Sequence, residues 1–256
     1  MPDYKTPQAS LFYTGTTGSA DGPTVLWAHG WGQNHEAFSA LIESLAPAGR
    51  HIAIDFPGFG QSPEPPEKWS TKDYADFMAS FIKDNELGPV IWAGHSFGVR
   101  VGIQMAAHYP DLIQGFCGLA GAGLKSKRPL HKELYIKARI FLFKTLKAML
   151  PLGLSREWLH TKFGSSDYNN TTGIMRDTFI GVVNEDLVSE ASDIKCPTIL
   201  IYGVNDTETP PELGKRLSGL IPNSQLFLLD GQDHYTLLSS GRHPVIKLIN
   251  DFIKGL

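Results

Sequence analysis

Short, continuous runs of apolar residues alternate with amphipathic segments along most of this chain. Because these runs are mostly apolar at every position rather than at alternate ones, they indicate strands covered on both faces, as in a mostly parallel sheet. Six runs rich in β-branched and aromatic residues predict buried strands of this kind: Val25–Ala28, His51–Asp55, Val90–Ala93, Phe116–Leu119, Thr198–Tyr202 and Gln225–Leu229.

Helical periodicity lies between these runs. Apolar residues recur at helical spacing over 38–45 and again over 74–82. Ser70 and Asp73 precede the second stripe with the spacing of a capping pair. Strand–helix–strand alternation predicts an α/β fold, with a doubly wound, mostly parallel sheet and helices on both faces. Such sheets bind ligands at the carboxyl ends of their strands.

The alternation stops between residues 124 and 190 and resumes at Cys196. This stretch contains helical patterns and loops without a convincing strand, and about 65 residues is too long for a simple connection. We therefore expect an inserted helical cap at 124–190. The α/β core would then consist of residues 1–123 and 191–256.

The first part of the predicted cap, 124–150, carries eight Lys and Arg residues against one acid, Glu133, interleaved with apolar residues. One interpretation is a helix with its apolar side on the core and its lysines in water. The other is a surface that docks anionic substrates or lipids, as basic amphipathic helices do. Aromatic residues of the cap fit either an acyl pocket or the cap's own small core: Trp158, Phe163, Tyr168 and Phe179.

Size and composition limit the function classes. A chain of 256 residues fits one large domain with an insertion, and a formal net charge of −3 gives no reason to expect nucleic acid as a partner. No apolar run reaches the length of about 18 residues that a membrane span needs, and no secretory signal pattern opens the chain, so we expect a cytoplasmic protein. Cys117 and Cys196 fit small buried apolar residues, and no Cys/His group has metal-ligand spacing.

The segment Gly94–Gly98, which reads GHSFG, directly follows the third apolar run. A serine flanked by glycines two positions away, between a strand and a helix, is typical of a nucleophile elbow. To lift its hydroxyl clear of the sheet, Ser96 must adopt a strained positive φ, which side chains at the flanking positions would obstruct. Ser96 is therefore the candidate nucleophile.

A serine hydroxyl needs a base, and the base works best when a carboxylate fixes its tautomer. Of nine histidines, His234 lies on a loop just after the last predicted strand, at the edge of the sheet where Ser96 is expected. His29 and His95 adjoin a glycine or the nucleophile and fit a role in loop geometry. His234 is therefore the candidate base.

The candidate acid is Asp206, which follows the predicted strand Thr198–Tyr202. Asp230 and Asp233 are the competitors, but the carboxylate of Asp233 adjoins His234 in sequence and reaches that imidazole's Nδ1 with difficulty. The oxyanion of a tetrahedral intermediate also needs preorganised donors. We expect them to be the backbone amides of Phe97, at a helix N-terminus, and of Trp31, between two glycines.

These motifs together resemble the α/β-hydrolase superfamily, in its branch of small capped serine hydrolases. In that family the chain order is nucleophile, acid, histidine, which is the order here. The resemblance implies that the loop beginning at Asp55 is structural and that a serine nucleophile separates this chain from epoxide hydrolases and haloalkane dehalogenases. It rests on His29–Gly32, Asp55–Ser62, the Ser96 elbow, Asp206 with Pro210, and His234.

The expected function is a serine hydrolase, a carboxylesterase that cleaves small or medium carboxylic esters through an acyl-enzyme. Two alternatives use the same triad: a C–C bond or lactone hydrolase, and a slow-turnover small-molecule receptor. The resemblance implies an arginine over the substrate of C–C hydrolases, for which Arg139, Arg156 and Arg176 are candidates. No cofactor is expected, because a triad and an oxyanion hole suffice for acyl transfer. The sequence carries no signal of oligomeric state.

Overall fold

The computed structural model describes residues 3–16, 22–125, 138, 141, 142, 145, 168 and 170–256. Eight strands form one sheet in the order β1-β2-β4-β3-β5-β6-β7-β8. In this order, all neighbouring strands from β4 through β3 to β8 pair in parallel. At the other edge, β1 pairs with β2 and β2 pairs with β4 in antiparallel fashion. The strands are β1 (Asp3–Lys5), β2 (Ser10–Thr16), β3 (Thr24–Ala28), β4 (Arg50–Asp55), β5 (Val90–His95), β6 (Ile113–Leu119), β7 (Thr198–Gly203) and β8 (Ser224–Leu229).

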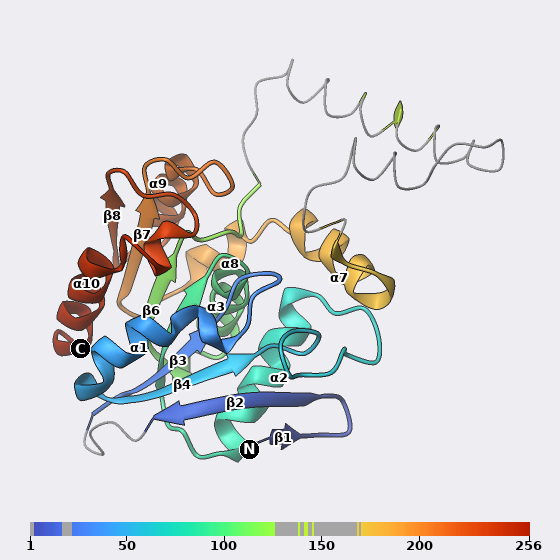
Figure 1. The fold of residues 1–256 in the computed structure, drawn as a ribbon, viewed down its shortest axis with the longest axis horizontal. Coiled ribbons are helices and arrows are strands. Elements are labelled where there is room, and N and C mark those ends of the chain that lie inside the picture. The colour runs from blue at the N-terminus through green and yellow to red at the C-terminus, as the bar shows by residue number, and fades with distance from the viewer. Residues whose placement is uncertain are drawn as a thin grey trace.

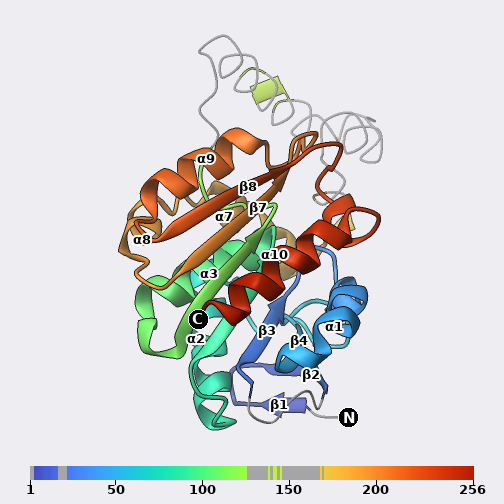
Figure 2. The same ribbon diagram turned by 90° about the vertical axis from the view of Figure 1, so that its left-hand side faces the viewer.

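Helices cover both faces of this sheet, as the two views show (Figures 1 and 2). The helices α2, α3, α8 and α9 lie on one face, and α1 and α10 lie on the other. The helices are α1 (Ser39–Leu45), α2 (Thr71–Asp84), α3 (Phe97–His108), α7 (Gly173–Asn184), α8 (Val188–Asp193), α9 (Pro211–Leu220) and α10 (Arg242–Lys254), with short 3₁₀ turns at His35–Phe38, Ala46–Ala48, Pro110–Leu112 and Thr236–Leu238. The predicted doubly wound, mostly parallel fold is confirmed.

Two apolar clusters fill the space between these layers. The first lies under α2, α3, α8 and α9 and contains Trp92 and Leu217. The second lies under α1 and α10 and contains Trp27 and Leu41. Because successive residues of a strand point to opposite faces, a strand between the two clusters must be apolar at nearly every position, as the sequence pattern of β3 and β5 indicates.

All six predicted strands are present, but the burial expected for the last of them is wrong. β8 is the edge strand next to β7, so its side chains are only partly buried and Leu228 is exposed. The sequence also gave no indication of β1 and β2. Both are short or mixed in polarity and lie at the opposite edge of the sheet, where the apolar continuity of a buried strand is not required.

The start of α2 follows its sequence signal. The Ser70 side chain accepts a hydrogen bond from the Asp73 amide, and the Asp73 side chain accepts one from the Ser70 amide, which is a complete capping box.

The interpretation of both cysteines as buried residues holds for Cys117 only. Cys196, just before β7, is half-buried.

The predicted cap falls mostly outside the described residues. Of the basic segment 124–150, the structure describes 124, 125, 138, 141, 142 and 145, and Trp158, Phe163, Arg139 and Arg156 lie outside the described part. The boundaries at 124 and 190 stay a prediction. None of the helices in the described ranges is long and apolar enough to cross a membrane.

The last part of the predicted cap packs on the core. The hydroxyl of Thr178, in α7, accepts a hydrogen bond from the Trp69 amide over 3.3 Å. The carboxylate of Glu185, after α7, accepts one from the Thr71 amide over 3.1 Å and another from the Thr71 hydroxyl. These contacts fix α7 against the N-terminus of α2.

Candidate active site

Ser96 occupies the turn between β5 and α3. Its backbone has φ 50° and ψ −103°, a conformation that residues with a side chain rarely adopt. The Ser96 amide donates to the Leu119 carbonyl over 3.0 Å, and its carbonyl accepts from the Val99 amide over 3.1 Å. The elbow is therefore held by the neighbouring strand and by the first turn of its own helix.

The two flanking glycines are required by close approach of backbones. A Cβ on Gly98 would lie 1.9 Å from the carbonyl oxygen of Ala28, at the end of β3. A Cβ on Gly94 would lie 2.6 Å from the carbonyl of Gly98 itself. Because no heavy atom fits at these distances, α3 approaches the sheet as closely as it does only with glycine at both positions.

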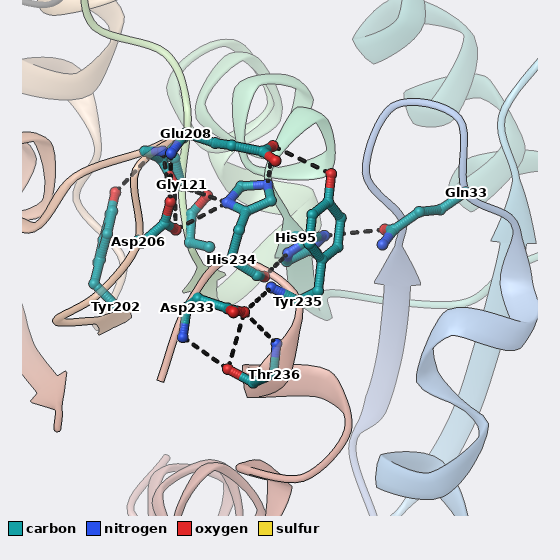
Figure 3. Close-up of polar contacts among 12 residues, drawn as sticks. Gln33, His95, Gly121, Tyr202, Asp206, Glu208, Asp233, His234, Tyr235 and Thr236 are labelled. Carbon is teal, nitrogen blue, oxygen red and sulfur yellow. Dashed lines mark hydrogen bonds and ion pairs between the residues drawn. The ribbon is translucent and has the colours of Figure 1, made fainter. Parts of the chain in front are cut away.

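His234 and Asp206 form a buried hydrogen-bonded pair on the loops after β8 and β7 (Figure 3). The Nδ1 of His234 lies 2.8 Å from Oδ2 of Asp206, so Nδ1–H donates to the carboxylate. This bond fixes the tautomer that leaves Nε2 of His234 as the hydrogen-bond acceptor, which is what a general base for a serine hydroxyl requires.

The second oxygen of the Asp206 carboxylate is held by its own loop. Oδ1 accepts from the amides of Glu208 and Thr209, each over 2.8 Å. Burial alone would raise the pKa of Asp206, but the hydrogen bonds from His234 and Thr209 outweigh it and hold that pKa below its usual value. Asp206 therefore stays ionised beside the imidazole.

Asp233 and Asp230, the competitors for the acid, do not contact the imidazole by any hydrogen bond. The Asp233 carboxylate turns back to its own loop and accepts from the amides of Tyr235 and Thr236 over 3.0 and 2.9 Å (Figure 3). Asp230 is exposed at the end of β8. Of these three candidate acids, Asp206 is the one that is hydrogen-bonded to the His234 imidazole.

His95 links the loop after β3 to the loop that carries His234. One ring nitrogen, Nε2, lies 2.9 Å from the His234 carbonyl oxygen, and Nδ1 lies 3.0 Å from Oε1 of Gln33 (Figure 3). Gln33 Oε1 accepts a hydrogen bond from the Gly30 amide over 2.8 Å. Burial lowers the pKa of His95 to about 3, so the ring is neutral. The expected role of His95 in loop geometry is confirmed.

His29 and Asp55 have structural partners as well. His29 accepts from the Phe56 amide at Nε2 over 3.0 Å and donates from Nδ1 to the Gly30 carbonyl over 2.7 Å. The buried Asp55 carboxylate accepts from the His35 and Gln61 amides over 2.6 and 2.8 Å. Neither residue points a free functional group at Ser96, in agreement with the roles expected from the sequence.

The two residues whose amides are the candidate oxyanion donors are in contact through their side chains. The rings of Trp31 and Phe97 meet edge to face with centroids 5.3 Å apart. Within the described ranges, neither the Trp31 amide nor the Phe97 amide donates a hydrogen bond, whereas the neighbouring Gly30 amide is bound to Gln33. Two unengaged amides beside a serine elbow are the arrangement that binds an oxyanion.

The loop that carries His234 is tied to the residue before Ser96. The contact of His95 with the His234 carbonyl brings the His234 loop next to the elbow. Within the described part of the chain, the Ser96 hydroxyl makes no side-chain hydrogen bond. Such bonds are often long in ligand-free enzymes and tighten when substrate binds.

Three polar residues of the site were missed by sequence reasoning. Thr209 lies with its hydroxyl 2.9 Å from Asp206 Oδ2 and 2.9 Å from the Ala120 carbonyl. Gln33 contacts His95 as described, and Glu208 places Oε2 3.5 Å from Nε2 of His234. Only Thr209 had a local signal, because an Asp three residues before a Thr favours a turn in which the Asp side chain accepts hydrogen bonds from the backbone amides that follow it.

Aromatic rings surround the elbow on the side of α7. Trp31 packs against Phe59 at 4.8 Å and against Phe179 of α7 at 5.1 Å between ring centroids. Arg176, one turn earlier in α7, stacks its guanidinium over the Tyr168 ring at 5.1 Å. Of the three arginines considered from the sequence, Arg176 is the one in a described range. No group of three metal-ligating side chains is assembled in the part of the chain that the structure describes.

Comparisons with known proteins show which proteins this chain is similar to. A family model described as alpha/beta hydrolase fold matches residues 23–139. The chain is 27% identical over 247 residues to 2-(acetamidomethylene)succinate hydrolase of Mesorhizobium japonicum, covering 91% of this chain and 88% of that protein. It is 26% identical over 250 residues to the pimeloyl-[acyl-carrier protein] methyl ester esterase of Neisseria meningitidis serogroup A, covering 91% and 77% of the two chains.

A solved structure with the same fold is that of a thermophilic esterase from Thermogutta terrifontis. The TM-score is 0.74 at 20% sequence identity, and the match covers 100% of this chain and 99% of that one. At this identity the likeness concerns the fold. The two curated relatives are named as a hydrolase and an esterase.

Proposed function

This chain belongs to the α/β-hydrolase superfamily, and from that premise we propose that it is a serine hydrolase that cleaves small or medium carboxylic esters. Ser96 is the nucleophile, His234 the general base and acid, and Asp206 the carboxylate that orients His234. The backbone amides of Trp31 and Phe97 form the oxyanion hole. No cofactor takes part in this proposal.

In the acylation half, the Ser96 oxygen attacks the ester carbonyl carbon while His234 Nε2 takes its proton. The carbonyl oxygen becomes an oxyanion that accepts hydrogen bonds from the Trp31 and Phe97 amides. The bond between the carbonyl carbon and the leaving oxygen then breaks, and His234 gives its proton to that oxygen. The alcohol departs, and the acyl group stays on Ser96.

In the deacylation half, water repeats the same steps. His234 Nε2 takes a proton from the water, whose oxygen attacks the acyl carbon. The second tetrahedral intermediate collapses, the bond to Ser96 breaks, and the proton on His234 returns to the serine oxygen. The carboxylic acid leaves, so that one ester and one water give one acid and one alcohol.

The observation that carries this proposal is the strained Ser96 elbow, at φ 50°, beside an imidazole that donates Nδ1–H to the buried Asp206. Strain of this kind costs of order 1–3 kcal/mol and persists mainly where function needs it. A structural serine would not need it, since any residue in an ordinary turn would connect β5 to α3.

We also propose that 124–190 covers this site. The support is the contact between Phe179, in α7, and Trp31, whose amide is a proposed oxyanion donor. Met175 in the same helix is buried, and a Cβ on Gly58 would lie 2.3 Å from its sulfur. The end of the proposed cap therefore packs directly on the loops that surround the elbow.

A second candidate is hydrolysis of a substituted succinate, favoured by the relative named 2-(acetamidomethylene)succinate hydrolase. The same Ser96, His234 and Asp206 would carry it. Esters remain the first choice, because they are the least demanding acyl substrates and another relative is named a methyl ester esterase. A comparison of kcat/KM for both substrate types separates the two.

The test is hydrolysis of p-nitrophenyl esters of increasing acyl length by the wild-type chain and by Ser96→Ala. We expect turnover that falls by around 10⁶ in the variant, as in other triads that lose their nucleophile. Circular dichroism of both proteins controls for folding. Equal rates in wild type and variant, or no turnover of any ester, would exclude the proposed function.

A further inference from the structure

Glu208 lies beside Nε2 of His234, the atom that takes up and returns the proton in the proposed mechanism. Its Oε2 is 3.5 Å from Nε2 of His234, and the Tyr235 hydroxyl donates to the same oxygen over 3.2 Å (Figure 3). The Glu208 amide donates to Asp206 Oδ1, so the residue is anchored to the acid's loop at its backbone. The triad chemistry described above does not use this carboxylate.

Both side chains are partly exposed to solvent. The Glu208 side chain is 48% exposed and Tyr235 is 52% exposed, although both contact the buried His234. The Tyr235 ring meets the His234 ring edge to face with centroids 5.0 Å apart. A negative charge and an aromatic ring thus lie together at the exposed side of the imidazole.

The position of the leaving group follows from the proposed function. His234 Nε2 must come within about 3 Å of the leaving oxygen to give it a proton. Glu208 Oε2 then lies no more than about 6.5 Å from that oxygen, given its contact with Nε2. A group two or three bonds beyond the leaving oxygen reaches the carboxylate and the phenol ring.

We infer that Glu208 and Tyr235 form a subsite for a positively charged leaving group, such as an amino alcohol or quaternary ammonium alcohol. The inference rests on the proposed function, because it takes the leaving group to lie at His234 Nε2. A cation pairs with the carboxylate and is attracted to the face of an aromatic ring. A neutral group would displace water from Glu208 without replacing the interactions of that water with the carboxylate. An anionic group would be repelled by the carboxylate.

The competing account is that Glu208 acts only through His234, as a positioning residue. The two accounts differ in what they predict for substrates. A positioning residue changes the rate of every ester by a similar factor, because all of them use the same imidazole. A subsite changes the ratio between a cationic ester and a neutral one of the same shape.

The experiment compares two butyrate esters that differ in charge alone, those of choline and of 3,3-dimethylbutanol. We expect the wild-type chain to prefer the choline ester in kcat/KM and Glu208→Gln to reduce that preference by about fivefold, the effect of one partly exposed ion pair. Tyr235→Leu lowers the same ratio, and Tyr235→Phe, which retains the ring, largely preserves it. Glu212→Gln, the same charge change at an exposed position of α9, is the matched control.

A wild-type ratio near one, or a ratio that is the same in Glu208→Gln, would overturn the subsite and leave the positioning account. Failure of the proposed function gives a different result, since neither ester would then be hydrolysed or Ser96→Ala would hydrolyse both. Calorimetric titration with choline alone gives a readout without turnover. We expect binding to the wild-type chain that is about fivefold weaker in Glu208→Gln, and equal or absent binding would overturn the inference.

Discussion

At the scale of single residues, the site depends on protonation states that hydrogen-bond partners fix. His234 donates Nδ1–H to Asp206, which keeps Nε2 available for a proton. Hydrogen-bond partners also fix the tautomer of His29, which has a structural role. Its Nε2 accepts from the Phe56 amide and its Nδ1 donates to the Gly30 carbonyl. A second proton on the His29 ring would break the bond that Nε2 accepts from the Phe56 amide.

Replacement of Asp206 by Asn tests this account of the imidazole. An Asn amide would favour the wrong tautomer of His234, so we expect Asp206→Asn to lower kcat by on the order of 10⁴. Asp233→Asn is the control: it makes the same chemical change one residue before His234, but its side chain accepts from the Tyr235 and Thr236 amides instead. Ester kinetics that respond equally to both variants would argue against Asp206 as the acid.

The three candidate triad residues could be proposed from the sequence because each has a local signal. Ser96 has flanking glycines, and Asp206 and His234 each follow a run typical of a strand. Gln33 and Glu208 had no such signal. Gln33 meets His95, 62 residues away in sequence, and Glu208 meets His234 from a separate loop, so only the folded chain brings these pairs together.

At the scale of elements, the close approach of α3 to the sheet determines the geometry of the elbow. The apolar strands and the capped start of α2 could be predicted, because propensity and burial agree there. β1 and β2 could not, because short antiparallel edge strands need no continuous apolar run. The partial exposure of β8 depends on strand order, which the apolar run at 225–229 does not encode.

Two glycine substitutions test the packing of α3. A Cβ at Gly98 would lie 1.9 Å from the Ala28 carbonyl, so we expect Gly98→Ala to lower the free energy of unfolding by about 3 kcal/mol and to reduce ester turnover. Gly219→Ala, near the end of α9, meets no atom within 4 Å and should stabilise the protein by about 0.5–1 kcal/mol. Urea titrations that rank the two variants in the opposite order would contradict this account of the elbow.

At the scale of the whole molecule, the parallel sheet assembles the site. The loops after β3, β5, β7 and β8 carry Trp31, Ser96, Asp206 and His234, and the carboxyl ends of parallel strands lie at one edge. The contact between His95 and His234 spans 139 residues of sequence. The alternation of strands and helices predicted that the site lies at this edge. Which side chains contact one another there depends on the order of the strands in the sheet, which the alternation does not give.

Three buried histidines make the stability of the whole fold depend on pH. Burial lowers the pKa of His29 to about 4, that of His95 to about 3, and that of His51 below its usual value of 6.5. Below about pH 6.5 these histidines bind protons in the unfolded chain but stay neutral in the folded chain. The free energy of unfolding therefore falls as the pH falls from 6.5 toward the pKa values that the histidines have in the folded chain.

The expected slope approaches about 1.4 kcal/mol per pH unit for each of His29 and His95. Urea denaturation at intervals between pH 7.5 and 5 measures it. The lowered pKa of Asp206 acts in a separate window, below its usual value of 3.8, so it does not contribute over this range. A free energy of unfolding that stays constant from pH 7.5 to 5 would show that the folded chain takes up these protons as readily as the unfolded chain does.

The most direct test of the central claim is the mass of the intact protein during turnover of a p-nitrophenyl ester, quenched in acid. Ser96 as the nucleophile predicts a population heavier by one acyl group, which peptide mapping places on Ser96 and which Ser96→Ala does not form. An acyl group on another residue, or ester hydrolysis by Ser96→Ala at the wild-type rate, would contradict the account.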